Sequence, residues 1–180
     1  MPFAVALYLD HAADAAVRAL SRRLDPTRFP GFTSGSEVHA HISLVVCDGL
    51  DVEQFRPALA QFAAETPRLP CTLASLGVFS TDEGVIFLAP TASRALIDVQ
   101  EQVVERLSQF GAQVGPYWIP GNWVPHCTLA IGIPRELIPT AVGVCHAAFR
   151  PIAGQLTQVS LFEIDPVRPC YEFDLRPVER

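Results

Sequence analysis

The same four-residue pattern of histidine, apolar residue, hydroxyl residue and apolar residue occurs at two places in this chain. It reads HISL from His41 and HCTL from His126. A neutral imidazole accepts a proton and an imidazolium donates one, and a pKa near 6.5 makes both forms accessible close to neutral pH. Hydroxyl groups can hydrogen-bond to phosphate oxygens and stabilise charge that develops in the transition state. These residue types therefore predict cleavage of a phosphoester without a metal ion.

The spacing within each pattern is that of one face of a β-strand. Alternate side chains of a strand point to the same side of the sheet. We therefore expect His41 and Ser43 to share one face, and His126 and Thr128 to share another, while the apolar residues between them enter the core. If the two strands face each other, both histidines are catalytic and both hydroxyls bind phosphate in a single cleft.

The two patterns occupy equivalent positions in a longer repeat. The segment VALYLDHAADAAVRAL near the N-terminus parallels VIFLAPTASRALIDVQ in the second half. Ser75 follows His41 by 34 residues, and Ser160 follows His126 by the same number. A repeat of this length indicates two similar units that face each other. We expect a single domain over 1–180, with pseudo-repeats at about 1–80 and 84–175.

Hydrophobic periodicity predicts the elements that position these residues. Strands are expected at 3–9, 41–46, 71–79, 85–89, 126–131, 155–164 and 170–175, and helices after 14, at 56–65, after 91 and at 136–148. Asp14 is the expected N-cap of the first helix. The pattern favours an α+β fold that is bilobal and pseudo-two-fold, with two antiparallel sheets facing a central cleft and the helices outside.

Composition excludes several classes of function. The formal charge is −6, which disfavours a tight grip on DNA or a long nucleic-acid backbone. All 13 basic residues are Arg, so mechanisms that need a lysine are excluded, and no P-loop or dinucleotide-binding motif occurs. Five cysteines without a CxxC pair are typical of a reducing compartment. No signal peptide or membrane span is evident, so we expect a cytoplasmic monomer without membrane contacts.

The paired patterns in a duplicated chain of this length resemble the two-histidine (2H) phosphoesterase superfamily, and within it the 2′-5′ RNA ligase-like proteins. The resemblance covers essentially the whole chain. It implies a metal-independent RNA 2′,3′-cyclic phosphodiesterase without a cofactor, acting on a small phosphorylated nucleotide or an RNA terminus. It further implies that His41 is the acid and that His126 activates water, with Ser43 and Thr128 holding the phosphate.

Several neighbouring residues keep two interpretations open. In the loop before the second pattern, an aromatic cluster either stacks a nucleobase or fills the gap between the halves; its members are Tyr117, Trp118 and Trp123. The equivalent first-half loop holds Phe32 and Arg28, which are candidate substrate contacts. Cys127 points away from His126 on a strand and is expected to be a core thiol.

Two other functions compete with hydrolysis by paired histidines. His39 forms an HxH pair with His41, which is also a spacing of metal ligands, so a metal-dependent hydrolase using both and His126 is an alternative. His39 is otherwise expected at the rim of the cleft. A cleft that binds a nucleotide or RNA end without turnover is the second alternative.

Overall fold

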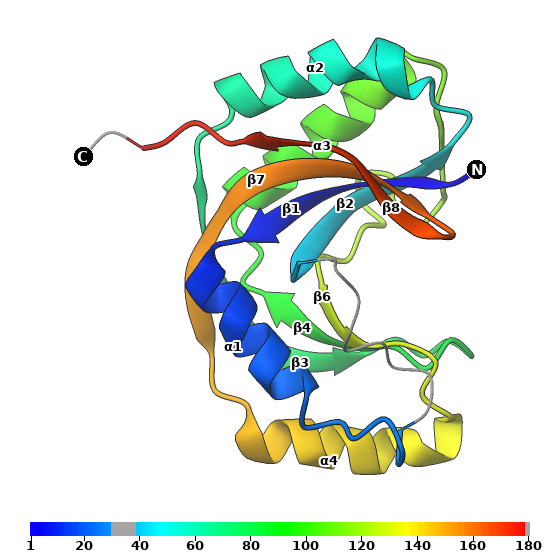
Figure 1. The fold of residues 1–180 in the computed structure, drawn as a ribbon, viewed down its shortest axis with the longest axis vertical. Coiled ribbons are helices and arrows are strands. Elements are labelled where there is room, and N and C mark those ends of the chain that lie inside the picture. The colour runs from blue at the N-terminus through cyan, green and yellow to red at the C-terminus, as the bar shows by residue number, and fades with distance from the viewer. Residues whose placement is uncertain (30–38, 179–180) are drawn as a thin grey trace.

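The computed structural model describes residues 1–29 and 39–178, and it contains one antiparallel sheet and four α-helices (Figure 1). The strands are β1 (Phe3–Leu9), β2 (His41–Asp48), β3 (Leu69–Val78), β4 (Ile86–Pro90), β5 (Gln113–Val114), β6 (Cys127–Ala130), β7 (Ile152–Ile164) and β8 (Val167–Asp174). The helices are α1 (His11–Ser21), α2 (Val52–Glu65), α3 (Arg94–Ser108) and α4 (Ile138–Ala148), with a 3₁₀ turn at Arg135–Leu137. The expected α+β class with antiparallel strands is confirmed.

The expectation of two separate sheets is wrong, because the strands form one continuous sheet. Its order is β5-β2-β1-β7-β3-β4-β6, and β8 pairs with β7. The long strand β7 joins the two parts: its residues from Leu156 to Glu163 pair with β1, and those from Ile152 to Leu156 pair with β3. Local periodicity could not predict this join, since each end of β7 has the same alternation whichever strand it pairs with.

Strands β3 and β7 are the third strands of the first and second predicted repeats, and they pair at the centre of the sheet. Pro70 of β3 lies directly opposite Gln155 of β7. These two positions are 85 residues apart, as are His41 and His126. Strand β3 also pairs with β4, and β7 pairs with β1, so each strand completes the half of the sheet formed by the other repeat.

The helices lie outside the bent sheet. Helices α2 and α3 cover the part formed by β1, β2, β7 and β8, and α4 covers β3 at the other end, with α1 beside it (Figure 1). None of the described helices is both long and apolar enough to cross a membrane. The first helix begins at Asp10, whose side chain accepts a hydrogen bond from the Ala13 amide. The prediction that Asp14 is this cap is wrong, because β1 ends only at Leu9 and the first residue beyond it caps the helix; Asp14 is buried within the first turn.

Strand β1 separates the core from the candidate site. Its odd-numbered side chains belong to the main hydrophobic core beneath the helices. Ala4 and Ala6 point to the opposite face, where they pack with Phe162 of β7 in a small separate cluster. Ser43 pairs with Ala6 and His41 with Tyr8 across β1 and β2, so both residues of the first pattern project from this second face.

Candidate active site

His41 begins strand β2 and is half-buried against aromatic rings. Its Nδ1 atom lies 2.7 Å from the backbone carbonyl oxygen of His39. The ring centroid of Phe162 is 5.5 Å from that of His41, in an edge-to-face arrangement. Tyr8 lies directly opposite on β1, and its ring centroid is 6.1 Å from that of His41. These contacts restrict the imidazole to one orientation.

His126 lies immediately before β6 in a similar environment. Its Nδ1 atom lies 2.7 Å from the carbonyl oxygen of Val124, again the residue two positions earlier. Three aromatic rings surround the half-buried imidazole, with centroid distances of 4.8, 5.5 and 6.1 Å; they belong to Phe79, Phe87 and Trp118. The two histidines therefore share the same local hydrogen bond although 85 residues separate them.

This shared hydrogen bond fixes the tautomer of both rings. A carbonyl oxygen only accepts, so Nδ1 of His41 and Nδ1 of His126 must each carry the hydrogen and donate it. In the neutral ring, Nε2 is then unprotonated and available as a base; in the charged ring, Nε2 is the atom that can release a proton. Both histidines are thus held ready for proton transfer through Nε2.

The electrostatics of the site favour neutral imidazoles in the absence of ligand. Burial lowers the pKa of His41, and the carbonyl of His39 only partly offsets this by stabilising the imidazolium. A charge on His126 lowers the pKa of His41 further, so the two rings are close enough to repel when both are protonated. Burial also lowers the pKa of His126, with the Val124 carbonyl again opposing it.

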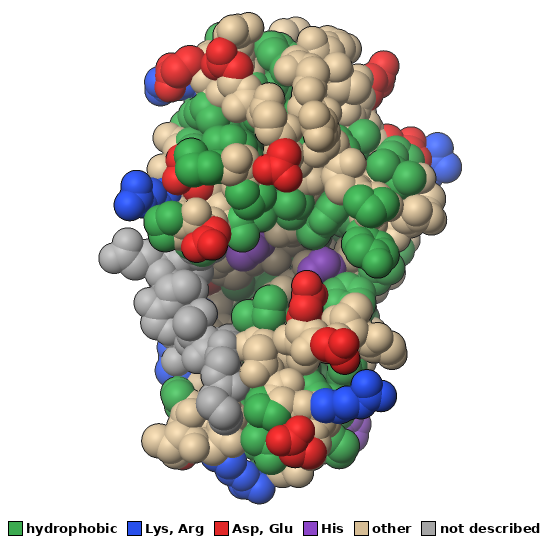
Figure 2. Space-filling model, turned by 90° about the vertical axis from the view of Figure 1, so that its right-hand side faces the viewer, with side chains coloured by type: hydrophobic (Ala, Val, Ile, Leu, Met, Phe, Trp, Pro, Cys, Tyr) green, Lys and Arg blue, Asp and Glu red, His purple; other side chains and the backbone are tan. Residues whose placement is uncertain are grey.

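The hydroxyl groups accompany the histidines on their strands. Ser43 is half-buried and lies two residues after His41 on the same face of β2. Thr128 is exposed on β6, where it pairs with Phe87, a ring that contacts His126. The space-filling view shows a hollow across the middle of one side of the molecule, with histidine side chains visible in it (Figure 2).

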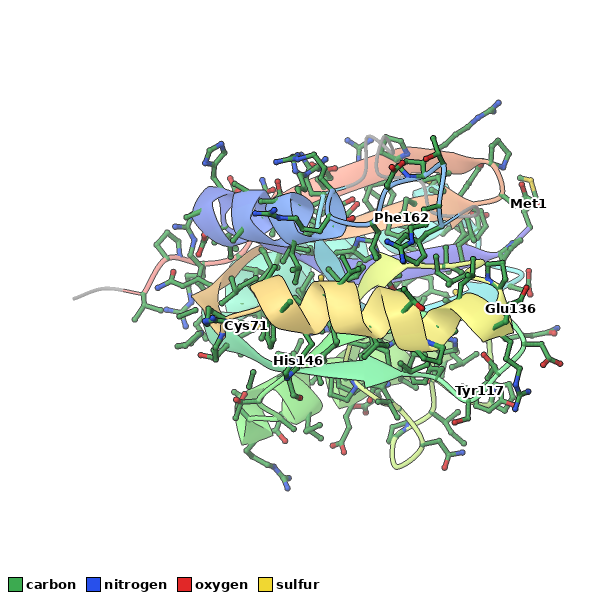
Figure 3. The ribbon with its side chains drawn as sticks, turned by 90° about the horizontal axis from the view of Figure 1, so that it is seen from below. Met1, Cys71, Tyr117, Glu136, His146 and Phe162 are labelled. Atoms are coloured by element: carbon green, nitrogen blue, oxygen red, sulfur yellow. The ribbon has the colours of Figure 1, made fainter. Side chains whose placement is uncertain are left out.

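The predicted aromatic cluster divides into three different environments. Trp123 is half-buried, and its indole Nε1–H donates to the carbonyl oxygen of Ser43 at 3.1 Å. Trp118 is also half-buried and lies against His126. Tyr117 is 78% exposed and lies toward the same side of the molecule as Met1 and Glu136 (Figure 3). Trp123 therefore holds the site together, whereas Tyr117 offers a free aromatic face.

A buried amide anchors the aromatic loop to the sheet. The side chain of Gln100 on α3 is 1% exposed. Its Nε2 atom donates to the carbonyl oxygens of Trp118 at 2.6 Å and of Leu44 at 3.3 Å. Helix α3 thereby links the loop before His126 to the strand that carries His41. Sequence analysis missed Gln100, although a polar residue on the apolar stripe of α3 was the available signal.

Two of the three remaining candidates, His39 and Arg28, are exposed. His39 is mostly exposed and its Nδ1 lies 3.5 Å from a carboxylate oxygen of Asp14. Arg28 is exposed, with its guanidinium 5.4 Å from the ring centroid of Phe29. Phe32 lies outside the described residues. The described residues contain no group of three or more His, Cys, Asp or Glu side chains arranged to hold a metal ion.

Tyr8 is a second residue at this site that sequence analysis missed. It is 3% exposed, its ring contacts both His39 and His41, and its hydroxyl donates to Oγ of Ser160 at 3.1 Å. The signal was present in β1, where Tyr8 continues the alternation of Ala4 and Ala6 away from the core. That this face of β1 lies beside His41 could be recognised only once the register against β2 was known.

A separate groove of about 440 Å³ lies between α1 and the connection from α4 to β7. Its walls are formed mainly by alanines of α1 and by residues 148–153. None of the candidate residues that the structure describes lines it, so it is separate from the site described above.

Comparison with known proteins identifies the family. The model of the 2′-5′ RNA ligase superfamily matches residues 9–168. The chain belongs to the 2′-5′ RNA ligase superfamily. This confirms the resemblance that the paired histidine patterns indicated. A search of curated proteins gave no match.

Solved structures agree with this membership of the 2′-5′ RNA ligase superfamily. E. coli LigT complexed with 3′-AMP is 15% identical with a TM-score of 0.63, and the match covers 97% of this chain and 99% of LigT. TT0787 of Thermus thermophilus is 19% identical with a TM-score of 0.64, covering 99% of this chain and all of TT0787. A structure described as a phosphoesterase is 16% identical with a TM-score of 0.64 and covers 96% of this chain and 97% of its own. At these identities the likeness shows a common fold.

Proposed function

We propose that this protein is a metal-independent phosphodiesterase that hydrolyses a 2′,3′-cyclic phosphodiester on a nucleotide or RNA end. The observation that carries the proposal is the matched hydrogen bonding of His41 and His126. Each Nδ1 donates to the carbonyl two residues earlier, which leaves each Nε2 for proton transfer. Membership of the 2′-5′ RNA ligase superfamily supports phosphoester chemistry at this pair.

Hydrolysis requires one neutral and one protonated ring. Nε2 of neutral His126 removes a proton from a water molecule as its oxygen attacks phosphorus. A new P–O bond forms to the water oxygen, and the bond from phosphorus to one ribose oxygen breaks. Nε2–H of the His41 imidazolium donates its proton to that leaving oxygen, which becomes a ribose hydroxyl. The product is a phosphomonoester, and solvent returns the two histidines to their starting forms.

In this proposal, the hydroxyls of Ser43 and Thr128 hydrogen-bond the non-bridging phosphate oxygens. Such bonds to charged oxygens strengthen as charge builds in the transition state. The class of ligand is supported by the fold neighbour LigT, whose structures are described as complexes with 3′-AMP, NADP⁺, phosphate and ATP. Tyr117 supplies an exposed aromatic surface on which a base can stack.

A substrate panel tests the proposal. The purified protein is incubated with the four nucleoside 2′,3′-cyclic phosphates and with short RNAs that end in a cyclic phosphate, with and without a chelator. We expect ring opening that survives chelation and is lost in H126A, and chromatography against 2′- and 3′-phosphate standards identifies the product. Absence of product from every substrate contradicts the proposal, as does activity that disappears with the chelator.

The lowered pKa of both histidines favours a second candidate, a module that binds nucleotides or RNA ends without turnover. Since burial disfavours the charged form of each ring, the unliganded site holds little imidazolium at neutral pH. Saturable binding of the same panel by calorimetry, without any product, would support this candidate.

A further inference from the structure

One peptide group beside His41 is hydrogen-bonded at both ends. The carbonyl oxygen of His39 accepts from Nδ1 of His41 at 2.7 Å. The amide N–H of Ala40, which belongs to the same peptide, donates to Oδ1 of Asp14 at 2.7 Å. A single planar amide therefore connects a carboxylate on α1 to the imidazole on β2, and hydrogen bonds in such a chain polarise one another.

Asp14 is buried and ionised. The residue is 7% exposed, and two hydrogen bonds from Nε of Arg18, at 3.0 and 2.9 Å, satisfy its oxygens together with the Ala40 amide. Burial alone would raise the pKa of Asp14, but the Ala40 amide and Arg18 outweigh it, with a smaller contribution from His39, so the pKa is lowered. The carboxylate is thus negative throughout the pH range in which histidines titrate.

The equivalent peptide beside His126 lacks this connection for a covalent reason. Its carbonyl belongs to Val124, and the nitrogen of the same peptide is that of Pro125. Proline has no amide hydrogen, so no carboxylate can bond to that end of the peptide. Both histidines therefore donate Nδ1–H to a backbone carbonyl, but only the peptide beside His41 also donates its N–H to a carboxylate.

We infer that Asp14 is a positioning residue that acts through the His39–Ala40 peptide to favour the imidazolium form of His41 over that of His126. The negative carboxylate draws electron density toward the carbonyl oxygen of His39, which strengthens its bond to the Nδ1–H of a charged ring. This influence of Asp14 acts in the unliganded protein, against the burial and the charge on His126 that lower the pKa of His41. Its consequence, that His41 is the acid and His126 the base, rests on the proposed function.

The other ionisable groups around His41 come from several elements. Tyr8 of β1 lies across the strand, Cys127 of β6 interacts with the backbone of His41, and His126 repels its charged form. Burial raises the pKa of Tyr8 and of Cys127, so both are neutral near pH 7. Arg18 and His39 accompany Asp14 on its other side. Within the described residues, Asp14 is the anion that reaches His41 through a continuous hydrogen-bonded path.

The test is an NMR titration of the imidazole resonances in the full-length, ligand-free protein. D14N keeps an oxygen that can accept from the Ala40 amide but removes the charge, so the pKa of His41 should fall by about half a unit or more while that of His126 stays nearly constant. D10N is the control, since it removes a carboxylate from the same helix end while the Asn oxygen can still cap the Ala13 amide; the bond from the Gln155 amide to the second Asp10 oxygen is lost. D10N should leave the pKa of His41 unchanged. Equal shifts of both histidines in D14N, or none, would overturn the inference.

A second variant tests the opposite sign and does not depend on D14N folding. R18Q removes the cation that offsets the carboxylate, so the pKa of His41 should rise; a fall would contradict the inference. For activity, D14N should move the alkaline limb of the pH profile of kcat/KM to lower pH with KM little changed at the optimum. If the wild-type protein hydrolyses nothing on the panel, the proposed function fails, but the titrations still decide the role of Asp14.

Discussion

The backbone of His41 interacts with the thiol of Cys127, the residue that follows His126. Burial raises the pKa of that thiol to about 12, and the hydrogen bond from the His41 backbone opposes this only in part. The contact brings the start of β2 against the start of β6, although these two strands are not paired in the sheet. It also shows that Cys127 faces inward, away from the hollow that holds the histidines.

The first prediction concerns the two histidines. H41A and H126A should each lower kcat on a cyclic phosphate by about a hundredfold or more, the usual loss for an acid or base residue. H146A is the control, since His146 is exposed on α4 and touches neither ring. Steady-state kinetics on the three proteins measures the effect. Near-normal rates in both H41A and H126A would rule out acid–base catalysis by this pair.

The second prediction is an optimum on the acidic side of neutrality. His126 must be neutral to act as base, so activity falls below its pKa; His41 must be charged to act as acid, so activity falls above its pKa. Burial lowers both pKa values from 6.5, which moves both limbs toward acid. A pH series of kcat/KM, which reports the free enzyme, should therefore peak below pH 6.5. A peak at alkaline pH would contradict the assignment.

The third prediction separates the hydroxyl of Thr128 from its methyl group. T128A should lower kcat/KM by about tenfold or more, because a hydrogen bond to a charged oxygen is lost. T128S keeps the hydroxyl and should retain most of the activity. Thr128 is exposed, so the free energy of unfolding of both variants should stay within about 0.5 kcal/mol of wild type. Equal loss in T128S and T128A would mean that the hydroxyl is not used.

The fourth prediction concerns the hydrogen bond from Trp123 to Ser43. W123F keeps an aromatic ring but removes the Nε1–H that caps the Ser43 carbonyl, so the free energy of unfolding should fall by about 1 kcal/mol. Urea denaturation measures this. Y117F serves as the comparison, since Tyr117 is largely exposed and its ring is preserved. If W123F is as stable as Y117F, the indole does not secure the strand.

The fifth prediction tests whether any thiol takes part in the chemistry. Burial raises the pKa of Cys47, Cys71 and Cys145 to about 11, and that of Cys127 further, so none forms a thiolate near pH 7. Iodoacetamide should label the half-buried Cys170 of the native protein and leave its activity intact. Mass spectrometry of the peptides locates the label. Labelling at Cys127 with loss of activity would indicate that this thiol takes part in the chemistry.

The sequence by itself was enough to predict the class of chemistry and the strand faces. A period of two placed His41 with Ser43 and His126 with Thr128, and this needed no tertiary information, because side-chain alternation is a property of one extended strand. The antiparallel α+β class also followed from local patterns. Asp14 marks the limit of such reasoning. An acidic residue near the start of a helix is a candidate N-cap, but the true cap depends on where the preceding strand ends, and here that makes it Asp10.

Only the tertiary structure decided how these local features combine. The single sheet depends on β7 pairing with β1 and β3 at once, and no residue of β7 encodes that choice locally. The hydrogen bond from the Ala40 amide to Asp14 joins residues that are 26 positions apart in the chain. The bond from the indole of Trp123 to the Ser43 carbonyl joins residues that are 80 positions apart. A sequence pattern specifies which atoms are available in each segment, but which of them meet depends on strand register and packing, which arise from the whole core.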